Sequence, residues 1–401
     1  MQIGIMFKED TPSDVRYSLL NAIQGREDEI FSETVVVVST PMENFTEVEE
    51  ILLNSPYVIR IEQPTLYKNA LVSVDPGYTA SQWHLKSTTT AGIGADVAWA
   101  NGNVGSDSIY VGVIDSGCFL HPDLIKNLGQ VPNESLVSGT DGNGNGKKND
   151  YYGWNFACNN NVTFDSPKSG SSSQLHGTYC SGIIGADGAN GTGVAGVCWN
   201  IRIIQANVVK PYGTGFNSFD CALAIRYFKE LKTLGVNVVA VNLSYEGSSN
   251  SFVEEAAMFD AQDILFVAAA GNSGQDVEAT PAYPGSCVSE NLINVGSTNA
   301  AGAMSTFSNY GWKSVDLFAP GENIYTTTGY RSDADMVSSF TTASGTSFSA
   351  PCVTGAIALY KAKYPAATAA QIKEAILANV TKVPALTSMC VSGGILNVRN
   401  F

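Results

Sequence analysis

The sequence predicts an α/β protein with a mostly parallel sheet and helices on both faces, preceded by a small α+β unit. From about residue 83 onward, nearly unbroken apolar runs of strand length recur, which is typical of strands covered on both faces. Helical stretches separate these runs, and the alternation favours a parallel sheet. The first 72 residues are richer in Lys and Glu and are expected to form a smaller unit of their own.

The N-terminal unit is expected to alternate strands and helices. Segment 13–25 has its apolar residues on one helical face and a glycine at its end, which predicts the first helix. Thr46 and Glu49 have the spacing of a capping box and predict the start of a second helix. Strands are expected at residues 2–7, 29–40 and 57–63. We therefore assign residues 1–72 to this unit.

A turn-rich segment leads into the larger unit. Residues 73–82 are expected to link the two units and to begin the larger one, which then spans 83–401. Its predicted strands are the apolar runs at 108–115, 201–209, 236–244, 263–271 and 292–297. Its predicted helices include 218–235, 251–262 and the amphipathic segment 366–380.

Composition excludes several classes of protein. The chain has 401 residues and a net charge of −15, the opposite sign from a protein that binds nucleic acid through phosphate contacts. No apolar run is long enough to span a bilayer, and no signal peptide is visible at the start. The eight cysteines form no CxxC pair, which disfavours zinc. We expect some disulfides, and buried free thiols remain the alternative.

Three fragments carry side chains suited to nucleophilic catalysis. Asp115 ends the apolar run in VGVIDSG, where open α/β sheets place their sites. His176 in QLHGTYC and Ser347 in SGTSFSAP each stand at the expected start of a helix. A nucleophilic serine needs a base to take its proton, and the base needs a carboxylate to orient it. The chain supplies all three, in the order Asp, His, Ser.

Few histidines compete for the role of base, because only His84, His121 and His176 occur. His84 lies beside a tryptophan and is expected to be packed or exposed, and His121 precedes a proline in a predicted loop. Gly177 follows His176 and leaves the backbone room for a substrate to approach. Alone, His176 would more often be an ordinary helix-end histidine, but beside the other two fragments it is the expected base.

Acyl transfer also needs hydrogen-bond donors for the oxyanion. Asn272 follows a predicted strand in FVAAAGNSG and is a neutral donor that could point back at the serine, although in isolation it resembles an ordinary turn asparagine. The second donor would be the backbone N–H of Ser347, at the positive end of its own helix.

In this order, the four fragments resemble those of the subtilisin-like serine peptidases, over most of the larger unit. The resemblance implies a mostly parallel sheet of seven strands with helices on both faces. It implies a catalytic triad and an oxyanion residue, which are Asp115, His176, Ser347 and Asn272. One departure is Tyr179, where the family usually has histidine. Because this position is not a proton partner of the catalytic histidine, we expect the chemistry to survive.

The same resemblance implies an extended peptide substrate that adds to the protein as a strand. The residues expected to bind it, including a proline that the family often has in cis, are Gly213, Thr214, Gly215, Ser244, Tyr245, Glu246, Gly271 and Pro284. Glu246 stands where the family usually has glycine, at the rim of the primary specificity pocket. It is either a solvated rim charge or a group that alters pocket access and favours basic or polar side chains.

The N-terminal unit resembles, in pattern and length, the inhibitory and chaperone propeptide of the same family, a ferredoxin-like α+β domain. This implies a zymogen that is cut in or near residues 62–75 and inhibited by its own N-terminal unit. An unrelated accessory domain is the alternative. Because parallel sheets depend on non-local contacts and fold slowly, a folding template has a physical rationale.

The segment DGNGNGKKND predicts a structural calcium (Ca²⁺) site. Alternate positions of an EF-hand-like loop are taken by Asp141, Asn143, Asn145 and Lys147. Tyr152 replaces the usual Glu at position 12, so Asp150 would take its part. An Asn-Gly surface turn is the alternative. A second candidate site, which includes an aspartate that matches a calcium ligand of the family, consists of Gln82, Asp123, Asp187, Asn190 and Thr192.

The expected function is that of a serine endopeptidase. Three alternatives remain: a catalytically silent peptide-binding protein of the same fold, a calcium-binding adhesion protein, and an esterase of the α/β-hydrolase type. The esterase would need GxSxG and the order Ser, Asp, His, which the chain lacks. Expected partners are protein or peptide substrates and the N-terminal unit, without nucleic acid or a transmembrane segment. Family habit and cysteine count favour a secreted or cell-surface protein, whereas the missing signal favours an intracellular one.

Overall fold

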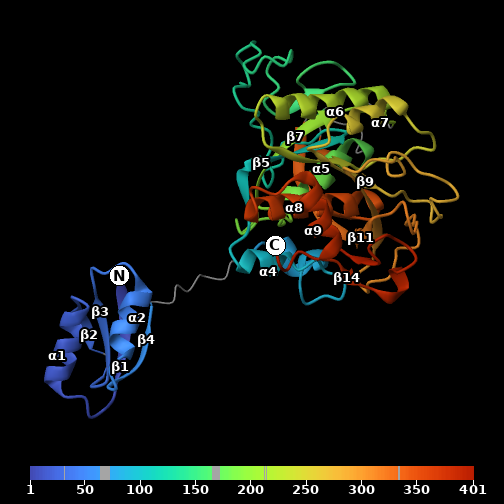
Figure 1. Cartoon of the computed structure of the whole chain (residues 1–401). Helices are drawn as coiled ribbons and strands as arrows, with labels where there is room; N and C mark the ends of the chain where they lie inside the picture. Colours follow the sequence, from blue (N-terminus) through green and yellow to red (C-terminus); the bar gives the residue numbers. More distant parts are fainter. Residues whose placement is uncertain (31, 64–72, 165–171, 212, 214, 333–334) are drawn as a thin grey trace. The chain divides into compact units, whose positions relative to one another are not determined.

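The computed structural model describes every residue except 31, 64–72, 165–171, 212, 214 and 333–334. The chain divides into two compact units, Met1–Asn69 and Ala70–Phe401 (Figure 1). The boundary that the sequence predicts, at residue 72, falls in a segment that the structure does not describe. Among the described residues, we find no helix with the length and apolar composition that a membrane span requires.

The N-terminal unit has the βαββαβ order of a ferredoxin-like domain. Its elements are β1 (Gln2–Phe7), α1 (Ser13–Ala22), β2 (Arg26–Ile30), β3 (Val35–Ser39), α2 (Phe45–Leu53) and β4 (Val58–Glu62). The strands form an antiparallel sheet in the order β2-β3-β1-β4. Alternate residues of the strands pack with the two helices in one apolar core, which includes Ile5, Val36, Val38, Leu20 and Leu52.

Two predictions for this unit are wrong. The single strand expected at 29–40 is a pair of strands, β2 and β3, because a turn in which Ser32 Oγ accepts the N–H of Val35 separates them. Thr46 and Glu49 do not form the start of α2 as a capping box. Asn44 caps the helix instead, and its side chain accepts the N–H of Thr46 at 3.1 Å. Asparagine is as good an N-cap as threonine, and it stands two residues earlier.

The larger unit is built on one sheet, which in the described part of the chain has nine strands in the order β14-β15-β11-β10-β9-β8-β5-β7-β6. All neighbours are parallel except β14 and β15. The strands are β5 (Gly105–Asp115), β6 (Gly153–Asn155), β7 (Asn200–Asn207), β8 (Val238–Leu243), β9 (Leu265–Ala269), β10 (Leu292–Thr298), β11 (Leu317–Pro320), β14 (Thr381–Lys382) and β15 (Gly394–Ile395). The seven strands from β11 to β6 are the number expected, and β14 and β15 add two residues each at one edge.

Helices cover both faces of this sheet, as predicted. They are α3 (Pro76–Ala80), α4 (Ala95–Ala100), α5 (Ser172–Gly185), α6 (Ser218–Thr233), α7 (Phe252–Phe259), α8 (Thr346–Lys363) and α9 (Ala369–Ala378), with short 3₁₀ turns η1 (Trp83–Leu85) and η2 (Pro384–Leu386). One core joins α5, α8 and α9 to Val111 and Val113 of β5, and the other joins α6 and α7 to Ile114. Successive residues of a strand point to opposite faces, so β5 contributes to both cores.

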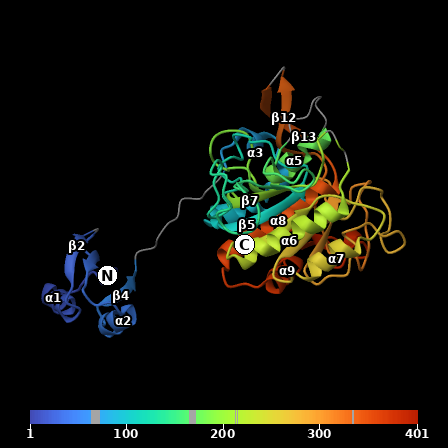
Figure 2. The ribbon, with the colours of Figure 1, turned by 90° about the horizontal axis from the view of Figure 1, so that it is seen from above.

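A two-stranded antiparallel ribbon, β12 (Ile324–Ser332) and β13 (Asp335–Ala343), leads into α8. Figure 2 shows this ribbon projecting from the body of the larger unit. Its base packs against α5, where Thr327 Oγ1 donates to the carbonyl of Thr178 at 2.8 Å. The ribbon therefore joins the helix that carries His176 to the helix that carries Ser347.

Seven cysteines have free thiols and do not form the expected disulfides: Cys118, Cys180, Cys198, Cys221, Cys287, Cys352 and Cys390. Six of these are buried and Cys287 is half-buried. They pack as small apolar side chains, which was the alternative reading of the cysteine count.

Candidate active site

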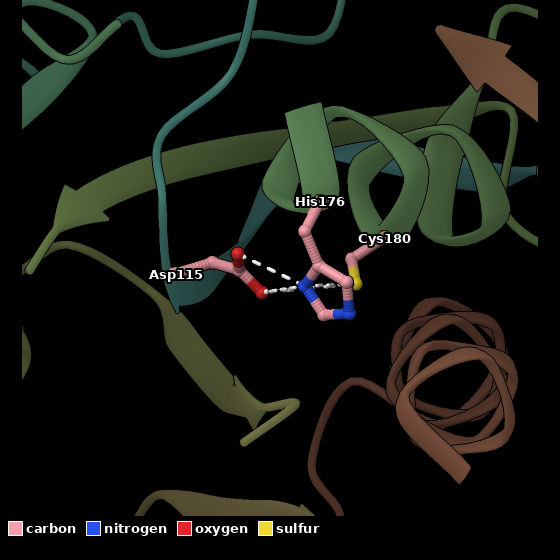
Figure 3. Close-up of side chains that lie close together, drawn as sticks. All are labelled: Asp115, His176 and Cys180. Carbon is pink, nitrogen blue, oxygen red and sulfur yellow. Dashed lines mark hydrogen bonds and ion pairs between the residues drawn. The ribbon is translucent and has the colours of Figure 1, made fainter. Parts of the chain in front are cut away.

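Asp115 and His176 form a hydrogen-bonded pair at the carboxyl end of β5. The carboxylate of Asp115 is fully buried, and His176 Nδ1 lies 2.8 Å from Oδ2 and 3.0 Å from Oδ1 (Figure 3). An ionised carboxylate only accepts, so Nδ1 must carry the proton and donate. The other ring nitrogen, Nε2, faces away from Asp115 and keeps its lone pair, as a general base requires.

Gly177 explains why α5 can approach β5 so closely. A Cβ atom added to Gly177 would lie 2.3 Å from the carbonyl oxygen of Gly117 and 3.2 Å from Cβ of Asp115. The space beside His176 is therefore used by the protein's own backbone, and not by substrate as the sequence predicts. The glycine is needed because it brings the helix within hydrogen-bonding distance of the carboxylate.

The charge of Asp115 sets the basicity of His176. Burial alone would lower the pKa of His176, but the Asp115 carboxylate together with Cys180 outweighs burial and raises this pKa well above its ordinary value of 6.5. Cys180 lies one turn further along α5, with Sγ 3.8 Å from Asp115 Oδ2 and 3.9 Å from His176 Nδ1 (Figure 3). Burial raises the pKa of the Cys180 thiol, so it remains a neutral, weak donor.

Ser347 is the second residue of α8, and a proline in the helix gives its carbonyl unusual partners. Pro351 has no N–H, so the carbonyl of Ser347 lacks the usual donor four residues ahead. Ser244 Oγ donates to that oxygen at 2.8 Å, and Cys180 Sγ donates at 3.5 Å. These two bonds fix the first turn of α8 against the segment after β8 and against α5.

The hydroxyl of Ser347 lies in the site but is bonded to the backbone. Its Oγ donates to the carbonyl of Ser244 at 3.1 Å. The ring of His176 lies beside the next residue, with 5.5 Å between its centroid and that of Phe348. Catalytic hydrogen bonds often form only when substrate binds, so the bond to the carbonyl of Ser244 does not rule out a role for this hydroxyl.

The side-chain amide of Asn272 is oriented by Thr346. Its Oδ1 accepts the N–H of Thr346 at 2.8 Å and the hydroxyl of Thr346 at 3.1 Å. Because these bonds occupy the amide oxygen, the amide Nδ2 is left to donate to a ligand. Gly271 before it has φ 105°, a conformation that favours glycine, and its N–H donates to Thr346 Oγ1.

Some of the other predicted substrate-binding residues lie around Ser347 and Asn272. Ser244 contacts Ser347 directly, and Glu246 Oε1 accepts the N–H of Asn272 at 3.0 Å. The peptide bond before Pro284 is cis, and the residue before it, Tyr283, pairs with Gly247 in a short antiparallel bridge.

The remaining substrate-binding predictions have less direct support. Tyr245 is buried, and its ring stacks on that of Phe216 at 5.0 Å. Gly213 and Gly215 lie in the irregular segment before α6. Thr214 lies outside the described residues.

The predicted calcium loop folds around its own oxygen atoms. Both carboxylate oxygens of Asp141 accept backbone N–H groups within the loop, and Asn145 Nδ2 donates to Asp150 Oδ2 at 2.8 Å. The Lys147 ammonium lies over three aromatic rings, so this residue could offer a cation only its backbone oxygen.

Glu134, which no sequence motif indicated, also joins this loop. Its Oε1 accepts the N–H of Gly142 and of Asn143, and its Oε2 accepts that of Asn149. Burial and the charge of Glu134 raise the pKa of Asp150 to about 6, although hydrogen bonds to Asp150 oppose them. Asp150 Oδ1 is buried without a hydrogen-bond partner among the described residues. Carboxylate and amide oxygen atoms gather here, and one buried carboxylate oxygen has no donor in the described part of the chain, so the residues present fit a hard cation.

The second predicted calcium site is assembled in part. Asn190 Nδ2 donates to Asp123 Oδ1 at 2.9 Å, and Thr192 Oγ1 donates to Asn190 Oδ1 at 2.7 Å. Gln82 instead pairs with both backbone groups of Ala195, and Asp187 pairs with a lysine.

Asp75 also lies at the second site and was missed. It is fully buried and accepts the N–H groups of Ala189 and Gly191. Burial, with the nearby charges of Asp75 and Asp187, raises the pKa of Asp123.

No motif in the sequence identified Glu134, Asp75 or Cys180. Glu134 is separated from Asp141 by an irregular segment, and Asp75 lies in the expected linker. The spacing of Cys180 four residues after His176 on a predicted helix was the one available signal, because such residues share a face.

Comparisons with known proteins agree with this geometry. A family model described as the subtilase family matches residues 106–393, a range that contains the Asp115, His176, Asn272 and Ser347 fragments. An extracellular protease of Xanthomonas campestris pv. campestris is 29% identical over 335 residues, which are 79% of this chain and 54% of that protein. The chain therefore spans about half the length of this relative.

Two further matches cover more of the proteins concerned. The major intracellular serine protease of Bacillus subtilis is 32% identical over 273 residues, which are 67% of this chain and 73% of that protein. A solved structure described as proteases from Pseudoalteromonas arctica has a TM-score of 0.62 and 27% identity, over 82% of this chain and 97% of that one.

Proposed function

The chain belongs to the subtilase family, and from this premise we propose that it is a serine endopeptidase. The observation that carries the proposal is the Asp115–His176 pair, in which His176 Nδ1 lies 2.8 Å from Asp115 Oδ2. The pair lies beside the first turn of the helix that bears Ser347. Asn272, with its amide oxygen already bonded, supplies a donor at the same place. A nucleophile, a base, an orienting carboxylate and an oxyanion donor are the groups that peptide hydrolysis requires.

The reaction follows from these positions. His176 Nε2 takes the proton of Ser347 Oγ, which attacks the carbonyl carbon of the peptide and forms the tetrahedral intermediate. The negative oxygen accepts hydrogen bonds from Asn272 Nδ2 and the backbone N–H of Ser347, at the N-terminus of α8. His176 then gives its proton to the leaving amine, and water repeats the sequence to release the acyl group.

The test compares the full chain with its Ser347→Ala variant on casein and on peptide substrates, and follows labelling of Ser347 by an organophosphonate. We expect hydrolysis and labelling by the unsubstituted chain and neither by the variant. Binding of peptides without hydrolysis or labelling, in protein freed of its first 72 residues, would establish the silent peptide-binding alternative.

We further propose that the N-terminal unit is an intramolecular inhibitor and folding template, removed in or near residues 62–75. Its support is the ferredoxin-like order of its elements and a sheet face that neither helix of the unit covers. Among the described residues of the unit, both helices pack on one face of the sheet, while Met6, Val35 and Val37 lie on the other. The larger unit also exposes apolar side chains on and near α6 and α7, namely Phe219, Leu223, Phe252, Phe259 and Val288. Uncovered faces of this kind are typical of surfaces that a partner covers.

Residues 1–72 supplied as a separate chain test this proposal. We expect them to restore refolding of a chain that lacks them and then to inhibit its activity. Met6→Ser should weaken inhibition, whereas Tyr17→Ser, an exposed aromatic on the helical side, should not. Full refolding of the shortened chain alone would remove the template role, and N-terminal sequencing of the mature protein would locate the cut.

We propose that calcium stabilises the loop 141–150, held by oxygen atoms of Asp141, Asn143, Asn145, Lys147, Asp150 and Glu134. The second site around Asp123 has support from Asp123, Asn190 and Thr192, with Gln82 and Asp187 as further candidates. The ion would supply positive charge to loops that carry several carboxylates.

We also propose export from the cell, because the Xanthomonas relative is named extracellular. The intracellular Bacillus relative represents the alternative, which fractionation of the source cells would test.

A further inference from the structure

Glu246 places a carboxylate between the two segments that carry the reaction. Two residues before it, the carbonyl of Ser244 accepts the hydroxyl of Ser347 at 3.1 Å. On its other side, Glu246 Oε1 accepts the backbone N–H of Asn272 at 3.0 Å. The side chain therefore links the segment that touches the nucleophile to the residue that would bind the oxyanion.

Gly271 leaves the room that the carboxylate occupies. A Cβ atom added to Gly271 would lie 2.0 Å from Glu246 Oε2, and φ of this residue is 105°. Only glycine is compatible with both the backbone conformation and the presence of the carboxylate. Oε2 itself has no hydrogen-bond partner among the described residues, so it is available to a ligand.

The charge of Glu246 has no counter-ion in the described part of the chain, where none of the ion pairs includes it. A carboxylate bonded to Asn272 opposes the negative charge that develops on the substrate oxygen during attack. A cation brought by the substrate would offset this effect, and the net charge of −15 adds a general attraction for cations. The electrostatics of the site therefore favour a basic side chain near the bond that is cut.

The position of that side chain follows from the reaction. The attacked carbonyl carbon must meet Ser347 Oγ while its oxygen meets Asn272 Nδ2, so the side chain on the neighbouring Cα enters beside the segments that contain Glu246 and Gly271. We propose that Glu246 is a specificity-determining residue, which makes the enzyme prefer lysine or arginine immediately before the cleaved bond. This inference rests on the proposed peptidase function.

The test measures kcat/KM on peptides that differ only at the residue before the cleaved bond, which is Lys, Arg, Gln, Met or Glu. The full chain, after any self-processing, is compared with Glu246→Gln, which keeps an oxygen that can accept the Asn272 N–H and removes the charge. Glu290→Gln removes one charge from an exposed position elsewhere and is the control. For the unsubstituted protein we expect Lys and Arg to exceed Gln and Met by roughly tenfold or more.

In Glu246→Gln this preference should fall to about twofold or less, with Gln and Met peptides cut at nearly the original rate and Glu peptides improved. An unsubstituted protein that cuts Lys and Met peptides equally would overturn the inference while leaving the peptidase function intact. A uniform loss in kcat on all five peptides would also overturn it, because Glu246 would then act only by positioning Asn272. Hydrolysis of none of the peptides would instead refute the proposed function, and the inference with it.

Discussion

Two histidines of the larger unit, His176 and His84, differ sharply in basicity. His176 lies 2.8 Å from the carboxylate of Asp115, and its pKa is well above 6.5. His84 is fully buried, and both of its ring nitrogens lack hydrogen-bond partners among the described residues. Burial, helped by the positive charge of Lys86, lowers the pKa of His84 to about 3. Burial lowers the pKa of both rings, but only His176 has gained an opposite charge.

The comparison teaches that the partner of a buried polar group, more than its burial, decides what the group can do. A ring with a carboxylate behind it can take a proton during a reaction and hold the resulting charge. A ring without one stays neutral and serves as an apolar filler. The same reasoning applies to an acid, Asp150, and to a backbone carbonyl, that of Ser347, so each can be used to test the rule.

Removing the partner of His176 should have the largest effect. Asp115→Asn is expected to lower kcat by about 10⁴-fold, because the amide no longer holds the required tautomer or stabilises the imidazolium. The pH profile should change as well. Activity of the unsubstituted protein falls when pH drops through the raised pKa of His176. The variant loses the charge of Asp115 while the burial that lowers this pKa remains, so the fall should occur at lower pH.

Asp107→Asn is the control for this prediction, because Asp107 is an exposed aspartate on the same strand, with a side chain 72% exposed. It should leave both kcat and the pH profile nearly unchanged. An Asp115→Asn variant whose acid limb stays in place would show that another group sets the pKa of His176.

His84 should make the folded state sensitive to acid. Its pKa is about 3 when folded and about 6.5 when unfolded, so the unfolded chain takes up a proton first as pH falls. The stability associated with a neutral His84 is complete above pH 6.5 and is lost progressively toward pH 3, by about 5 kcal/mol in total. Roughly 2 kcal/mol of this should be lost by pH 5.

Urea unfolding of Ser347→Ala protein, which cannot digest itself, gives the measurement. The His84→Phe variant in that background keeps an aromatic ring and has no proton to gain, so its midpoint should fall less between pH 7 and pH 5. If the urea midpoints of the two proteins fall equally between pH 7 and pH 5, His84 is not the cause of the acid sensitivity.

Asp150 extends the comparison to an acid whose neighbour has the same charge. Its pKa is raised to about 6, against an ordinary 3.8, so its ionisation costs about 3 kcal/mol of stability above pH 6 and nothing below pH 3.8. Calcium would supply the missing opposite charge. We therefore expect calcium affinity to rise as pH increases through about 6, with release of a proton, and chelation to lower the unfolding temperature.

Calorimetric titration with calcium at pH 5 and pH 7 measures both affinity and proton release. Asp150→Asn should remove most of the pH dependence, whereas Asp141→Asn should weaken binding by a similar factor at both pH values. Equal affinities of the unsubstituted protein at the two pH values would contradict a role for Asp150 in the site.

The sequence predicted strands and helices correctly where a local apolar pattern coincides with a buried position. The apolar runs that end at Asp115 and before Asn272 are β5 and β9, and the helices that begin near His176 and Ser347 are α5 and α8. Fold class followed from the same runs. The wrong predictions concern features for which several neighbouring residues are equally suitable. Examples are the cap of α2 at Asn44 and the turn that divides 29–40 into two strands.

The sequence could not show contacts made across the fold. Glu134 meets Asp150, and Glu246 meets Asn272, through chain reversals that no short window contains. The role of Gly177 was assigned to substrate for the same reason, because the carbonyl it faces belongs to Gly117, sixty residues away. Cysteine count alone likewise could not distinguish buried thiols from disulfides, since the chain is long enough to bury them.

The smallest effect is expected when the carbonyl of Ser347 loses a donor. This change tests most directly whether the partner of a buried polar group decides its contribution. Pro351 removes its usual donor, and Ser244 Oγ replaces it at 2.8 Å. Ser244→Ala should lower the free energy of unfolding by about 1 kcal/mol, because only the weak thiol donor of Cys180 remains. Pro351→Ala restores a backbone N–H, so in that background Ser244→Ala should cost distinctly less. A double-mutant cycle by urea unfolding measures the difference, and strictly additive losses would show that the two donors do not serve the same oxygen.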